Sequence, residues 1–223
     1  MAKPGIRTAK HFMIDTETLG LEPTAAIWEV TVMDFAQHSD GMAVPLTSVT
    51  ALMLPSSVAR EIEVGNLTYD KGTIAWSHSH GAPYFGEYWS AVEMCRPNLD
   101  QPHVVTAADQ AVAALASRLG YGTWYDRQDW LTGMAQMGVD KQSQVWVKGA
   151  SFDFPKLAHH TGRANLPWHY RNENCMRTVQ NMARRLDHSY DPKPGIAHTS
   201  YEDCVQQCAL LTEAQQIIMR ALR

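Results

Sequence analysis

The sequence is poor in cysteine, with four cysteines among 223 residues and no C-x-x-C motif. Cys204 and Cys208 lie one helical turn apart, a spacing that zinc sites use, but no second pair completes a four-ligand site. We therefore expect ordinary buried thiols rather than a zinc centre. Unpaired thiols are typical of a reducing compartment.

The sequence also lacks a long apolar run and an excess of basic residues. No stretch approaches the ~20 apolar residues that span a bilayer. The N-terminal "MAKPGIRTAK" is basic but has no apolar core of a secretory signal. We therefore expect no membrane contact and a cytoplasmic location. The formal net charge of −4 disfavours an electrostatic nucleic-acid binder, unless metal ions offset a carboxylate cluster.

Strand and helix patterns in the sequence predict an α/β protein. The length of 223 residues, 45% of them hydrophobic, fits one domain better than two. Apolar and β-branched runs predict strands at 11–15, 27–35, 46–55 and 143–150, the first three as an antiparallel meander. Helical patterns cover 57–72, 84–95, 106–120, 127–138, 154–160, 174–186 and 200–222. This order predicts a mixed β-sheet flanked by α-helices.

Several helix ends can be predicted from capping residues and loop signals. Thr106 is expected to cap helix 106–120 and Gly120 to end it. Asn174 is expected to cap the helix that follows it. The stretch "SHSHGAP", which contains His78 and His80, indicates a loop between two helices.

Two carboxylates, Asp15 and Glu17, end the apolar run of "HFMIDTETLG". Residues i and i+2 of a strand point to the same side, so these two acids should lie close together and repel each other. A divalent cation such as Mg²⁺, which prefers oxygen ligands, relieves that repulsion. The alternative is a surface strand end with two solvated acids, because D-x-E alone is common.

Two further segments place acids in a comparable context. A buried strand, a glycine turn and then Asp153 at the start of a helix are predicted in "WVKGASFDFPKL", although such an acid can also serve only the helix dipole. In "HTSYEDCVQQC", His198 precedes Asp203 by five residues, so both reach one site only if His198 lies on the loop before the helix. Ser200 and Asp203 also fit an S-x-x-D capping box, which gives Asp203 a purely structural alternative.

The order and spacing of these motifs are more specific than any one of them. The set resembles the DEDDh family of 3′–5′ exonucleases, which has the RNase H-like fold. The three motifs appear as "DTETLG" (15–20), "GASFDFPKL" (149–157) and "HTSYEDC" (198–204). The segment "WHYRNENCMRTV" further resembles the branch that contains the mycobacterial exoribonuclease-like domain and related phage exonucleases. The resemblance implies one exonuclease domain over 1–223, with an insertion around 56–105 near the active-site mouth.

The resemblance assigns roles to five residues. Four of them match its metal-binding acids, which hold two Mg²⁺ or Mn²⁺ ions: Asp15, Glu17, Asp153 and Asp203. His198 matches the general base. Asp15 is the expected bridging ligand. Where the family often has small residues before the last acid, this chain has Tyr201 and Glu202, so Glu202 is a rival to Asp203.

Substrate contacts are assigned less specifically than the acids. Thr18 and Leu19 match positions that line the 3′-terminal nucleotide. Single strands are commonly held by stacking on aromatic side chains, and the candidates are Trp76, Phe152 and Trp168, although most aromatics serve the core. Arg177, Lys148 and Lys156 either contact phosphate or pair with an acid.

The chemistry of phosphodiester hydrolysis agrees with this assignment. Two cations about 3.5–4 Å apart can clamp the attacking and leaving oxygens. A neutral histidine, which ordinarily titrates near ~6.5, can accept the proton of the attacking water, so activity should fall below that pH. We therefore expect a 3′–5′ exonuclease that releases nucleoside monophosphates from the 3′ end of a single strand.

Three alternatives remain open at the level of sequence. A nucleic-acid-binding module of the same fold without catalytic activity is the main one, and a scaffold whose acids are all caps is another. A metal-dependent phosphatase ranks low because the D-x-D nucleophile motif is missing. RNA is only slightly favoured over DNA, since discrimination rests on contacts to the 2′-hydroxyl. A homodimer is expected from the resemblance alone.

Overall fold

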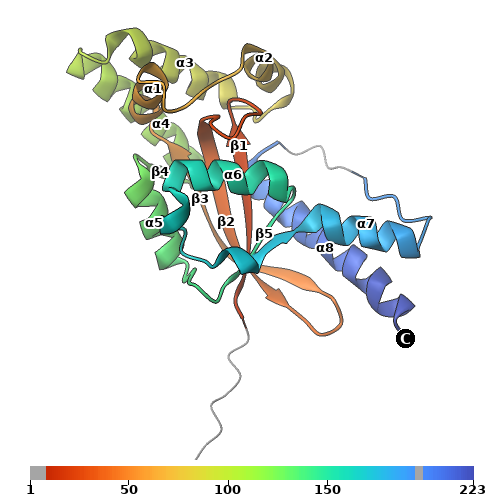
Figure 1. Ribbon diagram of the computed structural model, residues 1–223. Helices are drawn as coiled ribbons and strands as arrows, with labels where there is room; N and C mark the ends of the chain where they lie inside the picture. Colours follow the sequence, from red (N-terminus) through yellow and green to blue (C-terminus); the bar gives the residue numbers. More distant parts are fainter. Residues whose placement is uncertain (1–8, 194–197) are drawn as a thin grey trace, which may run out of the picture.

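The computed structural model describes residues 9–193 and 198–223 (Figure 1). Its centre is a six-stranded sheet in the order β4-β3-β2-β1-β5-β6. The strands are β1 (His11–Thr18), β2 (Ile27–Gln37), β3 (Ala43–Met53), β4 (Gly122–Trp124), β5 (Gln144–Val147) and β6 (Glu173–Cys175). β1, β2 and β3 pair antiparallel, whereas β5 joins β1, β6 joins β5 and β4 joins β3 in parallel. This mixed sheet confirms the predicted fold class.

Helices cover both faces of the sheet (Figure 1). The α-helices of the described residues are α1 (Pro55–Glu63), α2 (Lys71–His80), α3 (Phe85–Cys95), α4 (Pro102–Leu119), α5 (Arg127–Gln136), α6 (Ala150–Thr161), α7 (Met176–Leu186) and α8 (Ser200–Ala221). Short 3₁₀ turns stand at Arg96–Asn98, Arg163–Asn165 and Tyr170–Asn172. No helix in the described ranges combines the length and the apolarity needed to cross a bilayer.

Alternation along β1 divides its side chains between two cores. Phe12 and Ile14 belong to the larger core, which also receives residues from α1, α3, α4 and α6. Met13 belongs to the smaller core, together with Cys204 and Cys208 of α8. Because successive strand residues face opposite sides, the residues that follow Met13 at every second position also face α8. This face therefore receives the two carboxylates at the end of β1.

All four cysteines are free thiols; Cys95, Cys204 and Cys208 are buried as predicted, whereas Cys175 is half-buried. Cys204 and Cys208 are completely buried in the smaller core, where they act as small apolar side chains.

The segment predicted as one helix at 57–72 is two helices. α1 ends at Glu63 and the chain turns at Gly65, whose φ of +78° suits glycine. Asp70 then caps α2 by accepting the Thr73 N–H at 2.7 Å. The loop prediction for "SHSHGAP" is wrong at its start, because α2 continues to His80. The assignment of 56–105 as an insertion stays a prediction.

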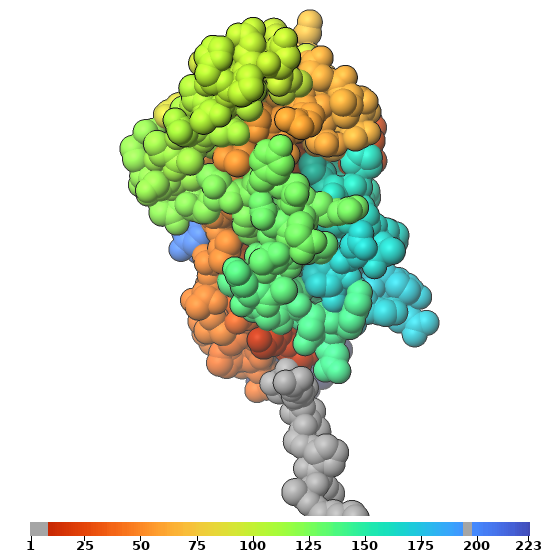
Figure 2. All heavy atoms as spheres, turned by 90° about the vertical axis from the view of Figure 1, so that its left-hand side faces the viewer, coloured from red at the N-terminus to blue at the C-terminus, as the bar shows by residue number. Residues whose placement is uncertain are grey.

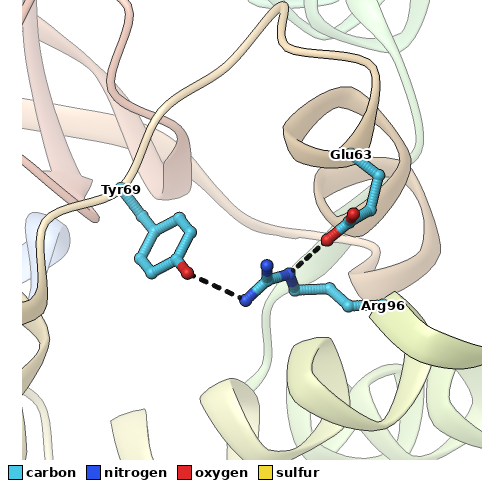
Figure 3. Close-up of polar contacts among 3 residues, drawn as sticks. All are labelled: Glu63, Tyr69 and Arg96. Atoms are coloured by element: carbon cyan, nitrogen blue, oxygen red, sulfur yellow. Dashed lines mark hydrogen bonds and ion pairs between the residues drawn. The ribbon is translucent and has the colours of Figure 1, made fainter.

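One arginine ties α1 to the residues that lead into α2 and to the end of α3 (Figure 3). Arg96 donates to the Glu63 carboxylate at 2.8 Å and to the Tyr69 hydroxyl at 3.1 Å. Its guanidinium also lies 4.8 Å from the centroid of the Tyr69 ring. These contacts hold the chain between α1 and α2, so α2 starts from a fixed position.

Other differences concern short strands and helix starts. β4 and β6 are three residues each, too short for alternation to be visible in the sequence. α4 starts at Pro102 rather than at Thr106, whereas Gly120 ends it in the left-handed conformation, as predicted. Asn174 lies in β6, and Cys175 precedes α7 instead. The N-terminal segment 1–8, where we expect no secretory signal, lies outside the described residues.

Candidate active site

Three carboxylates from the two ends of the chain meet at the C-terminal end of β1. Oxygen atoms of Asp15, Glu17 and Asp203 all lie within 4.8 Å of one another, and we call these residues the acidic triad. Asp15 and Glu17 share the α8-facing side of β1, and Asp203 stands in the first turn of α8. Three clustered carboxylates form an all-oxygen donor set, which suits a hard divalent cation. The triad could therefore bind a metal ion.

The start of α8 explains why Asp203 is available for the triad. Thr199 is the N-cap, and its hydroxyl oxygen accepts the Glu202 N–H at 3.2 Å. The same hydroxyl donates to the Glu202 carboxylate at 3.1 Å. The capping pair is thus Thr199 and Glu202 rather than the predicted Ser200–Asp203 box, because the N-cap lies one residue earlier. Glu202 serves the cap, and this removes it as the rival of Asp203.

The fourth acid, Asp153, approaches from the opposite side of the sheet. It lies in the first turn of α6, is 5% exposed and accepts the Gly149 N–H at 3.1 Å. The Thr16 hydroxyl also donates to it at 3.4 Å. Asp153 is not a member of the triad, but its charge raises the pKa of Asp15. It serves the start of α6 and is also an electrostatic neighbour of the triad.

Burial raises the pKa of every acid at the site, and repulsion between the acids adds to this for Asp15 and Glu17. The pKa of Asp15 is well above its ordinary value because of burial first, then the charges of Asp153 and Asp203. The same causes, with Asp15 and Glu29 as neighbours, raise the pKa of Glu17. Burial raises the pKa of Asp153 to about 6. The cluster therefore favours protons or a cation over four free carboxylates.

These raised pKa values predict how the stability of the metal-free protein depends on pH. The folded state of a group with a raised pKa binds more protons than the unfolded chain between the two pKa values. The free energy of unfolding in EDTA should therefore fall as pH rises from about 4 through 6, by ~3 kcal/mol from Asp153 alone. Urea denaturation between pH 4 and 7 measures this slope.

Two comparisons complete the pH experiment. Asp153→Asn should flatten the slope, and added Mn²⁺ should restore stability most strongly at the higher pH. A slope that is equal in the wild type and in Asp153→Asn would contradict the shared electrostatic cause.

Two residues at the site went unassigned or undecided at the level of sequence. The Gln207 side-chain amide donates to the Asp15 carboxylate at 2.5 Å and is 1% exposed. The ammonium group of Lys148 lowers the pKa values of Asp15, Glu17 and Asp203, so it is their cationic neighbour. A signal for Gln207 was its position one helical turn after Asp203.

His198 lies directly before α8, as its proposed role requires. It is half-buried, and its charge lowers the pKa of Asp203. The edge of its ring meets Trp76 of α2, with 5.2 Å between ring centroids and an angle of 86°. Trp76 is 48% exposed and also stacks on His80 at 5.5 Å. The helix α2 thus brings an exposed aromatic ring beside His198.

The other candidate substrate contacts differ in exposure. Phe152 is half-buried, whereas Leu19 is completely buried in the larger core. The Thr18 hydroxyl donates to the Gly20 carbonyl at 2.9 Å, and Arg177 is exposed near Asp153, whose pKa it lowers. The substrate roles of these four residues stay predictions.

Two further candidates are excluded by their surroundings. Trp168 is 2% exposed and packs near Phe154, so it serves the core, which was the alternative to base stacking. Lys156 is 1% exposed, and its ammonium group donates to the Leu21 carbonyl at 2.9 Å. The same group lies 3.2 Å from the centroid of the Phe152 ring. Lys156 therefore makes contacts within the folded protein and is not available to bind a phosphate.

A cavity of about 660 Å³ lies away from the acidic triad. It is bounded by α1, α5 and α6, on the side of the molecule that Figure 2 shows. Its lining includes Trp130, His159 and His160 but none of the four acids. Burial lowers the pKa of His160 to about 4, and its ring accepts the Ile27 N–H at 3.2 Å. This histidine is a neutral part of the fold.

Comparison with known proteins agrees with the geometry. Residues 10–215 match the model of the family described as the 3′–5′ exoribonuclease Rv2179c-like domain. No protein with curated annotation matches the sequence.

Solved structures share the fold at low sequence identity. A zinc-bound E. coli exonuclease I–ssDNA complex superimposes with a TM-score of 0.56 and 10% identity, over 96% of this chain and 42% of that one. E. coli exonuclease I with a 5cy-dA13 oligonucleotide gives 0.52 and 10%, over 94% and 41%. An ExoI/SSB-Ct complex gives 0.51 and 8%, over 96% and 42%. The chain spans about two fifths of the length of these proteins, and the likeness shows the RNase H-like fold.

Proposed function

The chain belongs to the Rv2179c-like family of 3′–5′ exoribonuclease domains, and on this premise we propose that it shortens single strands from the 3′ end. The products are nucleoside monophosphates. The observation that carries the proposal is the meeting of Asp15, Glu17 and Asp203 within 4.8 Å, with His198 directly before the helix of Asp203. Such a site needs a strand end that can enter it, which supports a single-stranded substrate.

Each residue of the site has a part in this proposal. Two Mg²⁺ or Mn²⁺ ions, held by the triad and Asp153, would supply charge stabilisation of the attacking and leaving oxygens. His198 takes the proton of the attacking water. Gln207 fixes the Asp15 carboxylate through its 2.5 Å hydrogen bond and would so hold this ligand in place for an ion.

The choice between RNA and DNA is inferred from the family rather than from any single contact in the site. The family description supports RNA, whereas the relatives of similar fold were crystallised with single-stranded DNA. We propose RNA as the preferred strand. The cytoplasm and a homodimer remain our expectations for the setting of this activity.

Parallel digestion tests the function directly. Matched RNA and DNA oligonucleotides, labelled at either terminus, are incubated with Mn²⁺ or Mg²⁺ and the products are resolved by length. We expect mononucleotides from the 3′ end, faster from RNA. Binding without any release would favour the catalytically silent module, and internal cuts would contradict the exonuclease.

Trp76 offers a prediction about substrate binding. Stacking of a base on an aromatic ring is worth ~1–3 kcal/mol, and Trp76 is 48% exposed beside His198. Trp76→Ala should therefore raise KM for an RNA oligonucleotide about tenfold and change kcat much less, while Trp76→Phe stays near the wild type. A fall in kcat at constant KM would instead mean that Trp76 acts by orienting His198.

A further inference from the structure

Glu29 is a completely buried carboxylate that the proposed chemistry does not use. It lies near the start of β2, directly opposite Glu17 of β1, and is 0% exposed. A buried charge is costly unless hydrogen bonds satisfy it. Glu29 accepts three: the Tyr84 hydroxyl at 2.6 Å, the Ser200 N–H at 2.7 Å and the Ser200 hydroxyl at 2.7 Å. We call Glu29, Tyr84 and Ser200 the Glu29 clamp.

The clamp holds the first turn of α8. Ser200 is the first residue of that helix, and its N–H is one of the four that have no partner within the helix. Glu29 satisfies that N–H, and the Thr31 hydroxyl lies 2.8 Å from the Ser200 hydroxyl. His198 lies two residues before Ser200 and Asp203 three residues after it. Fixing Ser200 therefore fixes both functional residues against β1 and β2.

The clamp also connects α8 to the helices before β4. Tyr84 stands at the start of α3, and its ring packs edge-on against Tyr121, with 6.2 Å between centroids. Tyr121 follows α4, and Thr199, the N-cap of α8, is near enough to lower the pKa of the Tyr121 phenol. Tyr84 thus contacts Glu29 itself, and Tyr121 lies beside the turn that Glu29 holds.

We propose that Glu29 is a positioning residue, which sets the first turn of α8 so that Asp203 meets Asp15 and Glu17 and His198 faces the substrate. This inference rests on the proposed function. Glu29 touches neither substrate nor metal in this scheme. Through the hydrogen bond from Tyr84 to Glu29, the start of α3 helps to hold the active site in place.

The test compares Glu29→Ala with Glu29→Gln. Alanine removes all three acceptor contacts, whereas the glutamine oxygen can still accept both bonds from Ser200. Since small misplacements at a reacting centre cost about a hundredfold, we expect Glu29→Ala to lower kcat ~100-fold with KM within about threefold. The Mn²⁺ concentration for half-maximal activity should rise ~10-fold or more. Glu29→Gln should recover most of kcat.

Two readouts do not depend on nuclease activity. The Kd for Mn²⁺ measured calorimetrically should rise ~10-fold or more in Glu29→Ala and little in Glu29→Gln. Amide hydrogen exchange should lose protection at Ser200 while the rest of α8 keeps it. If the wild type cleaves nothing, the proposed function fails, yet these two measurements still test the clamp.

A matched variant separates positioning from loss of stability. Val139→Ala shortens a buried valine between α5 and β5, outside the clamp, and should lower Tm without changing kcat or the Mn²⁺ dependence. The proposal is overturned if Glu29→Ala lowers only Tm, or if its kcat and Mn²⁺ affinity equal those of Val139→Ala.

Discussion

Asp15→Asn should abolish most activity and at the same time stabilise the metal-free protein. Asparagine keeps the oxygen that accepts the Gln207 amide at 2.5 Å but removes the charge from the centre of the triad. Metal-ion stabilisation of the transition state is worth several kcal/mol, so kcat should fall about a thousandfold, equivalent to ~4 kcal/mol. Relief of repulsion around Asp15, which is buried, should raise the free energy of unfolding in EDTA by ~1–3 kcal/mol.

Single-turnover assays and urea denaturation measure the two effects of Asp15→Asn. Asp34→Asn is the matched control, because Asp34 is an acid of β2 outside the triad. It should leave activity unchanged. Equal activity of Asp15→Asn and wild type would refute the metal assignment, and a loss of stability would refute the electrostatic account of the cluster.

His198→Ala should lower kcat by about 10²–10⁴, the range for removal of a general base. The imidazole lies immediately before α8 and faces the exposed ring of Trp76. The acidic limb of the pH–rate profile should disappear with it. Binding of the oligonucleotide should change little, because the role proposed for His198 concerns the attacking water rather than the strand.

His80→Ala provides the control for the loss of an imidazole near Trp76. The His80 ring stacks on Trp76 at 5.5 Å but has no part in the proposed chemistry. Its removal should change kcat less than about threefold. Exogenous imidazole should partly rescue His198→Ala alone. A His198→Ala protein with full kcat and an unchanged pH profile would defeat the general-base role.

The sequence predicted the pairing of Asp15 and Glu17 because the strand period is strict, whereas the approach of Asp203 was implied only by the family resemblance. Asp15 and Glu17 stand two residues apart after an apolar run, so their common direction follows from β geometry alone. The role of Asp203 was undecided, since Ser200–Asp203 and Thr199–Glu202 fit the same capping pattern one residue apart. Only the observed hydrogen bonds between Thr199 and Glu202 show which of the two capping pairs forms.

The residues that sequence reasoning missed depend on contacts between distant segments. Glu29 interrupts the apolar strand "IWEVTVMDF", and an acid at a position that should be buried was a signal that it needs partners. Those partners, Tyr84 and Ser200, lie 55 and 171 residues further along the chain. Short strands such as β4 and β6 were missed because three residues show no period.

The distance along the chain between the parts of the site has a consequence during synthesis. Gln207, which holds Asp15, follows it by 192 residues, and Asp203 belongs to the same last helix. A nascent chain in which α8 has not yet been made therefore has Asp15 and Glu17 without Asp203 and Gln207. The acidic triad can form only after α8 has been made and has packed against the sheet.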